Sequence, residues 1–116
     1  MNVSSGLAFV PLPLTPTYSA TKAAIHSWTE SLRVQLADTG VQVLELIPPA
    51  LRTALMGQEN DETAMPLDEY LTEVMSILET RPEAVEIMVD RVKVLRFAEA
   101  NGNYDKVLAR LSAHRG

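Results

Sequence analysis

Tyr18 and Lys22 stand four positions apart at the start of a segment with helical periodicity, so their side chains leave one helix face a turn apart. An ammonium group held beside a phenol favours the phenolate form, and the positive end of the helix acts in the same direction. A tyrosine so placed can protonate a carbonyl oxygen or deprotonate an alcohol. Ser5, on the turn before this segment, could donate a hydrogen bond to the same substrate oxygen. The three residues together predict a proton-transfer site.

The spacing of Tyr18 and Lys22 is weak evidence when taken alone. With three Tyr and three Lys in 116 residues, chance produces at least one such pair about 8% of the time. The alternative is a surface lysine that packs its aliphatic stem on a tyrosine at the start of a helix. The surroundings favour the catalytic interpretation, because Ser5 lies 13 positions before Tyr18 and a proline-rich segment joins them.

The elements that must position these residues follow in order along the chain. Residues 2–6 are expected to be the tail of a strand entering a turn, and three prolines in residues 7–17 predict a loop. Residues 18–37 have apolar positions at helical spacing, with Thr17 as the expected N-cap. Gly40 ends this helix, and the branched residues of segment 41–47 predict a strand covered on both faces. The order indicates an α/β fold.

The second half of the chain predicts further helices. Residues 50–64 are polar and are expected to be a loop, and Pro66 suits the first position of an amphipathic helix that reaches residue 78. Residues 86–89 are expected to form either a short strand, which we favour, or the start of the helix that covers residues 90–100, and a final helix is expected over residues 104–113. With 116 residues and 47% hydrophobic content, we expect residues 1–116 to form a single domain.

Two aromatic side chains of the first helix have simple interpretations. Trp28 shares helical spacing with Ile25 and Leu32 and is expected in the core. His26 is expected to be a solvated helix residue. A second stripe on this helix consists of small residues that would allow another helix to approach closely: Ala20, Ala23, Ala24, Ser27 and Ser31.

Composition excludes several classes of function. The net charge of -5 is spread along the chain without a basic stripe, so nucleic acid is not an expected partner. The chain has no cysteine, and its two histidines, His26 and His114, are far apart, so no metal site is expected. No apolar run approaches the roughly 20 residues of a membrane span, and the N-terminus lacks signal-peptide features. We therefore expect no membrane association and a cytoplasmic protein.

Three sequence blocks resemble the short-chain dehydrogenase/reductase family. They are Asn-Val-Ser-Ser-Gly at residues 2–6, Tyr-Ser-Ala-Thr-Lys-Ala-Ala at residues 18–24, and the strand that closes at Pro48-Pro49-Ala50-Leu51-Arg52-Thr53. The resemblance implies the C-terminal portion of a Rossmann-like, doubly wound parallel sheet, incomplete and helix-rich. It implies substrate orientation by Ser5, acid/base catalysis by Tyr18, and contacts of Lys22 with both Tyr18 and the nicotinamide ribose. NAD or NADP is the implied cofactor, with Lys22 and Thr53 as cofactor-binding residues.

The chain departs from the family pattern at two places. Pro49 occupies a position where the family usually has glycine, so a backbone donor to the cofactor is lost there. A loop threonine such as Thr53 can also satisfy its own backbone instead of a cofactor. The five glycines never stand closer than 14 positions, so no glycine-rich phosphate-binding turn is present. We therefore expect the chain to be a fragment that is inactive alone.

Three functions remain open at this point. The first is NAD(P)-dependent interconversion of an alcohol and a carbonyl, with Tyr18 as acid/base. The second is a non-catalytic oligomerising or interaction module derived from a truncated dehydrogenase, because an incomplete sheet leaves open edges and apolar faces. The third is complementation by a separate N-terminal half. A homo-oligomer is expected in either of the first two cases, formed through the helix over residues 18–37, the helix that the family uses to dimerise.

Overall fold

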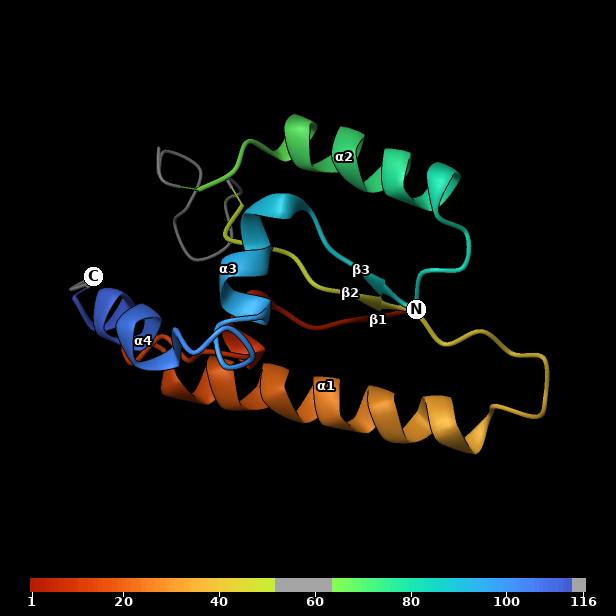
Figure 1. Cartoon of the computed structure of the whole chain (residues 1–116), viewed down its shortest axis with the longest axis horizontal. Helices are drawn as coiled ribbons and strands as arrows, with labels where there is room; N and C mark the ends of the chain where they lie inside the picture. Colours follow the sequence, from red (N-terminus) through yellow and green to blue (C-terminus); the bar gives the residue numbers. More distant parts are fainter. Residues whose placement is uncertain (52–63, 114–116) are drawn as a thin grey trace.

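A short parallel sheet lies between two long helices in the computed structural model (Figure 1). The structure describes residues 1–51 and 64–113, so Thr53 and His114 lie outside the described residues. Strand β1 (Asn2–Val3) pairs in parallel with β2 (Glu45–Leu46), and β2 pairs in parallel with β3 (Glu86–Ile87). Helix α1 (Pro16–Gln35) lies along one face and α2 (Leu67–Thr80) along the other. The predicted α/β class and incomplete Rossmann-like layering are confirmed.

All three strands run in one direction, so their carboxyl ends meet at one edge of the sheet (Figure 1). Both long helices also begin at this edge, as expected when each helix returns the chain to the start of a parallel strand. The turn after β1, a 3-10 helix η1 (Gly6–Ala8), packs against α1. The residues that follow each strand therefore lie at the same edge of the sheet as the residues that begin each long helix.

The first helix begins earlier than the sequence predicts. Thr15, not Thr17, is the N-cap residue, and its side chain makes no capping hydrogen bond. Pro16 begins the helix because its fixed φ suits the first turn and its missing N–H would have no partner there. Gly40 adopts a φ of 78°, a conformation that glycine reaches without a steric cost, and it turns the chain toward β2.

The prediction that Trp28 lies in the core is wrong, because its side chain is 60% exposed. The helix turns its polar and small residues toward the sheet at this level, where the fully buried Thr29 donates to the Ile25 carbonyl oxygen at 2.7 Å. Helical spacing identifies which residues share a face, but it does not decide which of two mixed faces contacts the sheet.

The predicted amphipathic helix after Pro66 is confirmed as α2, which buries Tyr70 and Val74 against β3. These two residues form a hydrophobic core with Ile87 and Val89. The hydroxyl group of Tyr70 is buried and has no hydrogen-bond partner among the described residues. Burial raises the pKa of Tyr70 to about 12, since the phenolate would be poorly solvated there.

The remaining predictions for the second half are confirmed in part. The short strand predicted over residues 86–89 exists as β3, with two residues in the ladder. The helix predicted over residues 90–100 is instead a 3-10 turn η3 (Asp90–Val92) followed by one turn of α-helix, α3 (Lys93–Arg96). Helix α4 (Tyr104–Ser112) follows Gly102, whose φ is 75°. In the part of the chain that the structure describes, no helix is both long and apolar enough to cross a membrane.

A second core joins the η1 turn to the C-terminal helices. It consists of Val10, Ala98 and Val107, with Leu95 and Leu108 packed against them. Gly6 is essential to this approach, because a Cβ atom at this position would lie 2.7 Å from both Leu95 Cδ1 and Val92 Cγ2. The side chains of η3 and α3 thus pack directly on the backbone of the turn that follows β1.

Substitution Gly6→Ala should lower the free energy of unfolding by about 1 to 3 kcal/mol, the usual cost of overpacking a core. Urea denaturation of the parent and variant chains would measure it. The double variant with Val92→Ala removes one of the two clashing atoms, so its loss should be smaller than the sum of the two single losses. Strict additivity would contradict the packing explanation.

Candidate active site

The structure places Tyr18 and Lys22 together in the first two turns of α1. The Lys22 ammonium lies 5.5 Å from the centroid of the Tyr18 ring, over its face. The same ammonium donates to the carbonyl oxygen of Val3 at 3.4 Å, on the last residue of β1. Lys22 therefore bridges the helix that carries Tyr18 and the strand that leads to Ser5.

Ser5 lies on the turn that directly follows β1 and is only 7% exposed. Its hydroxyl oxygen caps η1 by accepting a hydrogen bond from the backbone N–H of Leu7 at 3.1 Å. The backbone on both sides is held by β2, since Ser4 donates to the Leu46 carbonyl and Gly6 to the Pro48 carbonyl. The position of the Ser5 hydroxyl is thus fixed relative to the strands, and within residues 1–51 and 64–113 its O–H donates to no acceptor.

The cofactor-binding prediction for Thr53 falls outside the described residues. The neighbouring Pro48 is described, and its carbonyl oxygen accepts from Gly6 N at 3.1 Å. The end of β2 therefore lies beside the Ser5 turn, at the edge of the sheet where α1 begins (Figure 1).

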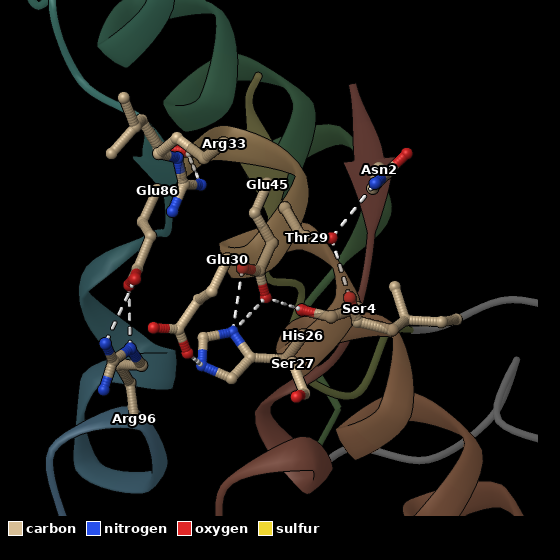
Figure 2. A network of polar contacts seen from close by, with 12 residues as sticks. Asn2, Ser4, His26, Ser27, Thr29, Glu30, Arg33, Glu45, Glu86 and Arg96 are labelled. Carbon is tan, nitrogen blue, oxygen red and sulfur yellow. Dashed lines mark hydrogen bonds and ion pairs between the residues drawn. The ribbon is translucent and has the colours of Figure 1, made fainter. Parts of the chain in front are cut away.

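A second polar group lies between α1 and β2, one helical turn beyond Lys22. This group was not predicted from the sequence. Glu45 is completely buried on the central strand β2. Its carboxyl oxygens accept a hydrogen bond from Ser4 Oγ at 2.6 Å and contact His26 Nδ1 at 2.8 and 2.9 Å (Figure 2). One feature could have identified the group: a glutamate in the middle of a strand covered on both faces requires a polar partner.

The prediction that His26 is a solvated helix residue is wrong, because its side chain is only 15% exposed. Glu45 contacts one ring nitrogen, and Glu30 contacts the other, Nε2, at 2.7 Å (Figure 2). The ring of Phe9 packs edge-on against the imidazole at a centroid distance of 4.5 Å. The histidine is therefore held between two carboxyl groups and an aromatic side chain.

An ion pair extends the network to the C-terminal part of the chain. The guanidinium group of Arg96 donates to both carboxyl oxygens of Glu86, at 2.7 and 3.1 Å, and lies 4.5 Å from the Phe9 ring centroid (Figure 2). The hydrogen bond and charge of Arg96 hold the pKa of Glu86 below its ordinary value, and the same pair raises the pKa of Arg96. α3 is thereby attached to β3 beside the buried histidine.

Comparison with known proteins gives a consistent family assignment. A family model described as short chain dehydrogenase matches residues 1–64. The chain is 37% identical over 117 residues to the uncharacterized oxidoreductase DltE of Bacillus subtilis (strain 168), a match that covers 97% of this chain and 45% of that protein. It is 33% identical over 73 residues to 17-beta-hydroxysteroid dehydrogenase type 3 of Mus musculus, covering 63% of this chain and 24% of that protein.

Among solved structures, the chain resembles a short chain dehydrogenase from Burkholderia cenocepacia J2315 that was crystallised in complex with NADP. The TM-score is 0.76 at 31% sequence identity, and the match covers 95% of this chain and 46% of that chain. The chain therefore spans less than half of the length of the relatives to which it is similar.

The pair between Glu86 and Arg96 predicts a specific dependence of stability on pH. Because the pKa of Glu86 is lowered in the folded chain, its contribution is complete above about pH 4.5 and is lost as the pH falls through the folded value. Substitution Glu86→Gln should cost about 1 to 2 kcal/mol at pH 7 and progressively less below pH 4.5. Urea unfolding between pH 7 and 3 would measure both losses.

A matched control is Glu79→Gln, which removes the same charge from an exposed position of α2. Its effect should stay within about 0.5 kcal/mol. A Glu86→Gln loss that persists unchanged at pH 3 would contradict the ionic explanation.

Proposed function

Because this chain belongs to the short-chain dehydrogenase family, we propose that it supplies the proton-transfer residues for NAD(P)-dependent interconversion of an alcohol and a carbonyl. In this proposal Tyr18 is the acid/base, Lys22 supports its phenolate form, and Ser5 donates a hydrogen bond to the reacting oxygen. The observation that carries the proposal is the position of the Lys22 ammonium, 5.5 Å from the Tyr18 ring and bonded to the strand that precedes Ser5.

Each residue has a defined task in carbonyl reduction. The Ser5 O–H, whose oxygen already accepts from Leu7, donates to the carbonyl oxygen and orients it. Tyr18 gives its phenolic proton to that oxygen as the carbon is reduced, which leaves a phenolate. The Lys22 ammonium stabilises this negative charge from one helical turn away. In alcohol oxidation the same groups work in reverse, with the phenolate of Tyr18 accepting the proton.

The nicotinamide cofactor supplies or accepts the hydride when it is bound. The relative from Burkholderia cenocepacia was crystallised with NADP, which supports a cofactor of the NAD(P) type. In this proposal the chain contacts the nicotinamide end of such a molecule through Lys22, and Thr53, which lies outside the described residues, is the second expected contact. The sequence has no glycine-rich turn for the pyrophosphate, so we infer that the isolated chain binds neither NADH nor NADPH with micromolar affinity.

The role of Tyr18 can be tested in a chimaera in which this chain replaces the matched segment of the NADP-bound relative. We expect the chimaera to oxidise NADPH in the presence of a ketone or aldehyde from a mixed panel. Substitution Tyr18→Phe should lower kcat by at least about 100-fold, since general acid catalysis contributes that much or more.

The matched control is Tyr104→Phe, which removes the same hydroxyl from the start of α4. Its kcat should remain within about twofold of the parent value. A chimaera that binds NADPH, measured by energy transfer from Trp28, but loses no activity with Tyr18→Phe would contradict the proposed function.

The exposed face of α1 favours a second proposed property, self-association into a homodimer. Trp28 is 60% exposed on this face, beside the small residues Ala20, Ala24, Ser27 and Ser31, all of which are exposed. A large aromatic next to small side chains allows close approach of two helices. The same surface would serve the alternative function, a non-catalytic interaction module. In that case substitution of Tyr18 has no effect on activity, whereas in the catalytic proposal it lowers kcat.

Substitution Ala24→Arg should convert the dimer into a monomer, because a long charged side chain prevents close approach of the helices. Size-exclusion chromatography with light scattering would then give a mass near 12.8 kDa instead of twice that value. Ser76→Arg, on the exposed side of α2, is the control and should leave the dimer intact. A parent chain that is monomeric at micromolar concentration would contradict the proposal.

A further inference from the structure

The carboxyl group of Glu45 is wholly buried at the centre of the sheet, where an unpaired charge would cost several kcal/mol. Two groups compensate for this burial, the hydroxyl of Ser4 and the imidazole of His26 (Figure 2). The contact with Ser4 is a short bond of 2.6 Å from one buried side chain to another. A chain gains nothing in core packing from such an arrangement, so its value must lie in the geometry that it fixes.

His26 faces a carboxyl group on each side of its ring. Both ring nitrogens lie within 2.9 Å of carboxyl oxygens, Nδ1 near Glu45 and Nε2 near Glu30. An ionised carboxyl group can only accept, and a neutral imidazole has a single N–H. Both contacts are hydrogen bonds to ionised carboxyl groups only when His26 is an imidazolium. Through Nδ1 the ring is held against the buried carboxyl group of Glu45.

Through these two partners Glu45 joins three segments of the candidate active site. Ser4 precedes Ser5 on the turn after β1, and His26 lies one turn beyond Lys22 on α1. Among the side-chain hydrogen bonds of the described residues, those of Glu45 alone join the central strand β2 both to the turn that leads to Ser5 and to the helix that carries Tyr18. The other links between α1 and β1, from Lys22 and Thr29, each join only two residues and do not reach the central strand.

We propose that Glu45 is a positioning residue for the Ser5 hydroxyl, acting through Ser4 and His26. Glu45 holds Ser4 from the side of the sheet that faces α1, and this fixes the backbone from which Ser5 projects. The His26 contact sets the same carboxyl group relative to the helix of Tyr18 and Lys22. The inference rests on the proposed catalytic role of Ser5, and it adds two residues, Glu45 and His26, that touch neither substrate nor cofactor.

The backbone N–H of Leu7 provides a direct measure of this effect, because it donates to Ser5 Oγ. In the 116-residue chain, Ser4→Ala removes only the link between Glu45 and the turn. We expect the Leu7 amide hydrogen to exchange about tenfold faster in this variant, relative to the Ile47 amide, which bonds to β3 and reports on the sheet. Glu45→Gln keeps the size of the side chain and should give the same result if Ser4→Ala does not fold.

The matched control is Thr29→Val, which removes a buried hydroxyl that also joins α1 to β1, through Asn2, but is not among the described hydrogen-bond partners of Glu45. This variant should leave the exchange ratio of Leu7 to Ile47 within about twofold of the parent ratio. Unchanged Leu7 exchange in both Ser4→Ala and Glu45→Gln would overturn the inference. An equal acceleration in Thr29→Val would also overturn it, because the effect would then reflect general loosening.

A kinetic test in the chimaera separates positioning from a merely structural role. Ser4→Ala should lower kcat about tenfold while the KM for NADPH stays within about twofold, and Thr29→Val should leave kcat unchanged within about twofold. Equal loss of kcat in the two variants would contradict the proposal. If the unsubstituted chimaera reduces no carbonyl, the proposed function fails, and amide exchange in the isolated chain still decides whether Glu45 fixes Ser5.

Discussion

The fold around the candidate site depends on the burial of one carboxyl group, that of Glu45, in the middle of a parallel sheet. Such a group is tolerated only with close polar partners, and the chain provides them from two directions, Ser4 directly after β1 and His26 on α1. This requirement fixes the rotation of α1 about its own axis. The face with His26 must contact the sheet, and the face with Trp28 is consequently left exposed.

The same rotation determines where the chemical groups lie. Tyr18, Lys22, His26 and Glu30 are spaced four apart and form one stripe of α1. When His26 is held against Glu45, Lys22 comes within reach of the last carbonyl of β1, and Tyr18 lies one turn closer to the edge where the strands end. Ligands of open parallel sheets bind at this edge, so a structural contact in the interior orients a surface site.

Membership of the short-chain dehydrogenase family and the limited length of the chain together explain which parts of the family fold are present. The chain spans less than half of the length of these relatives, and its described residues form three strands of a parallel sheet with a helix on each face. The phosphate-binding turn of such folds needs a strand, glycines and a helix in immediate succession. No segment of this sequence has that combination.

The sequence alone determined the α/β class, the α2 helix, the short strand β3 and the pairing of Tyr18 with Lys22, because periodicity and i, i+4 spacing are local properties of the chain. It gave wrong expectations for Trp28 and His26 and for the N-cap at Thr17. Each of these depends on which face of α1 meets the sheet or on how the chain enters the helix. Only the tertiary structure brought Glu45 to His26, residues 19 positions apart, and Ser4 to Glu45, residues 41 positions apart. Contacts between such distant positions arise from packing and leave no periodic pattern in the sequence.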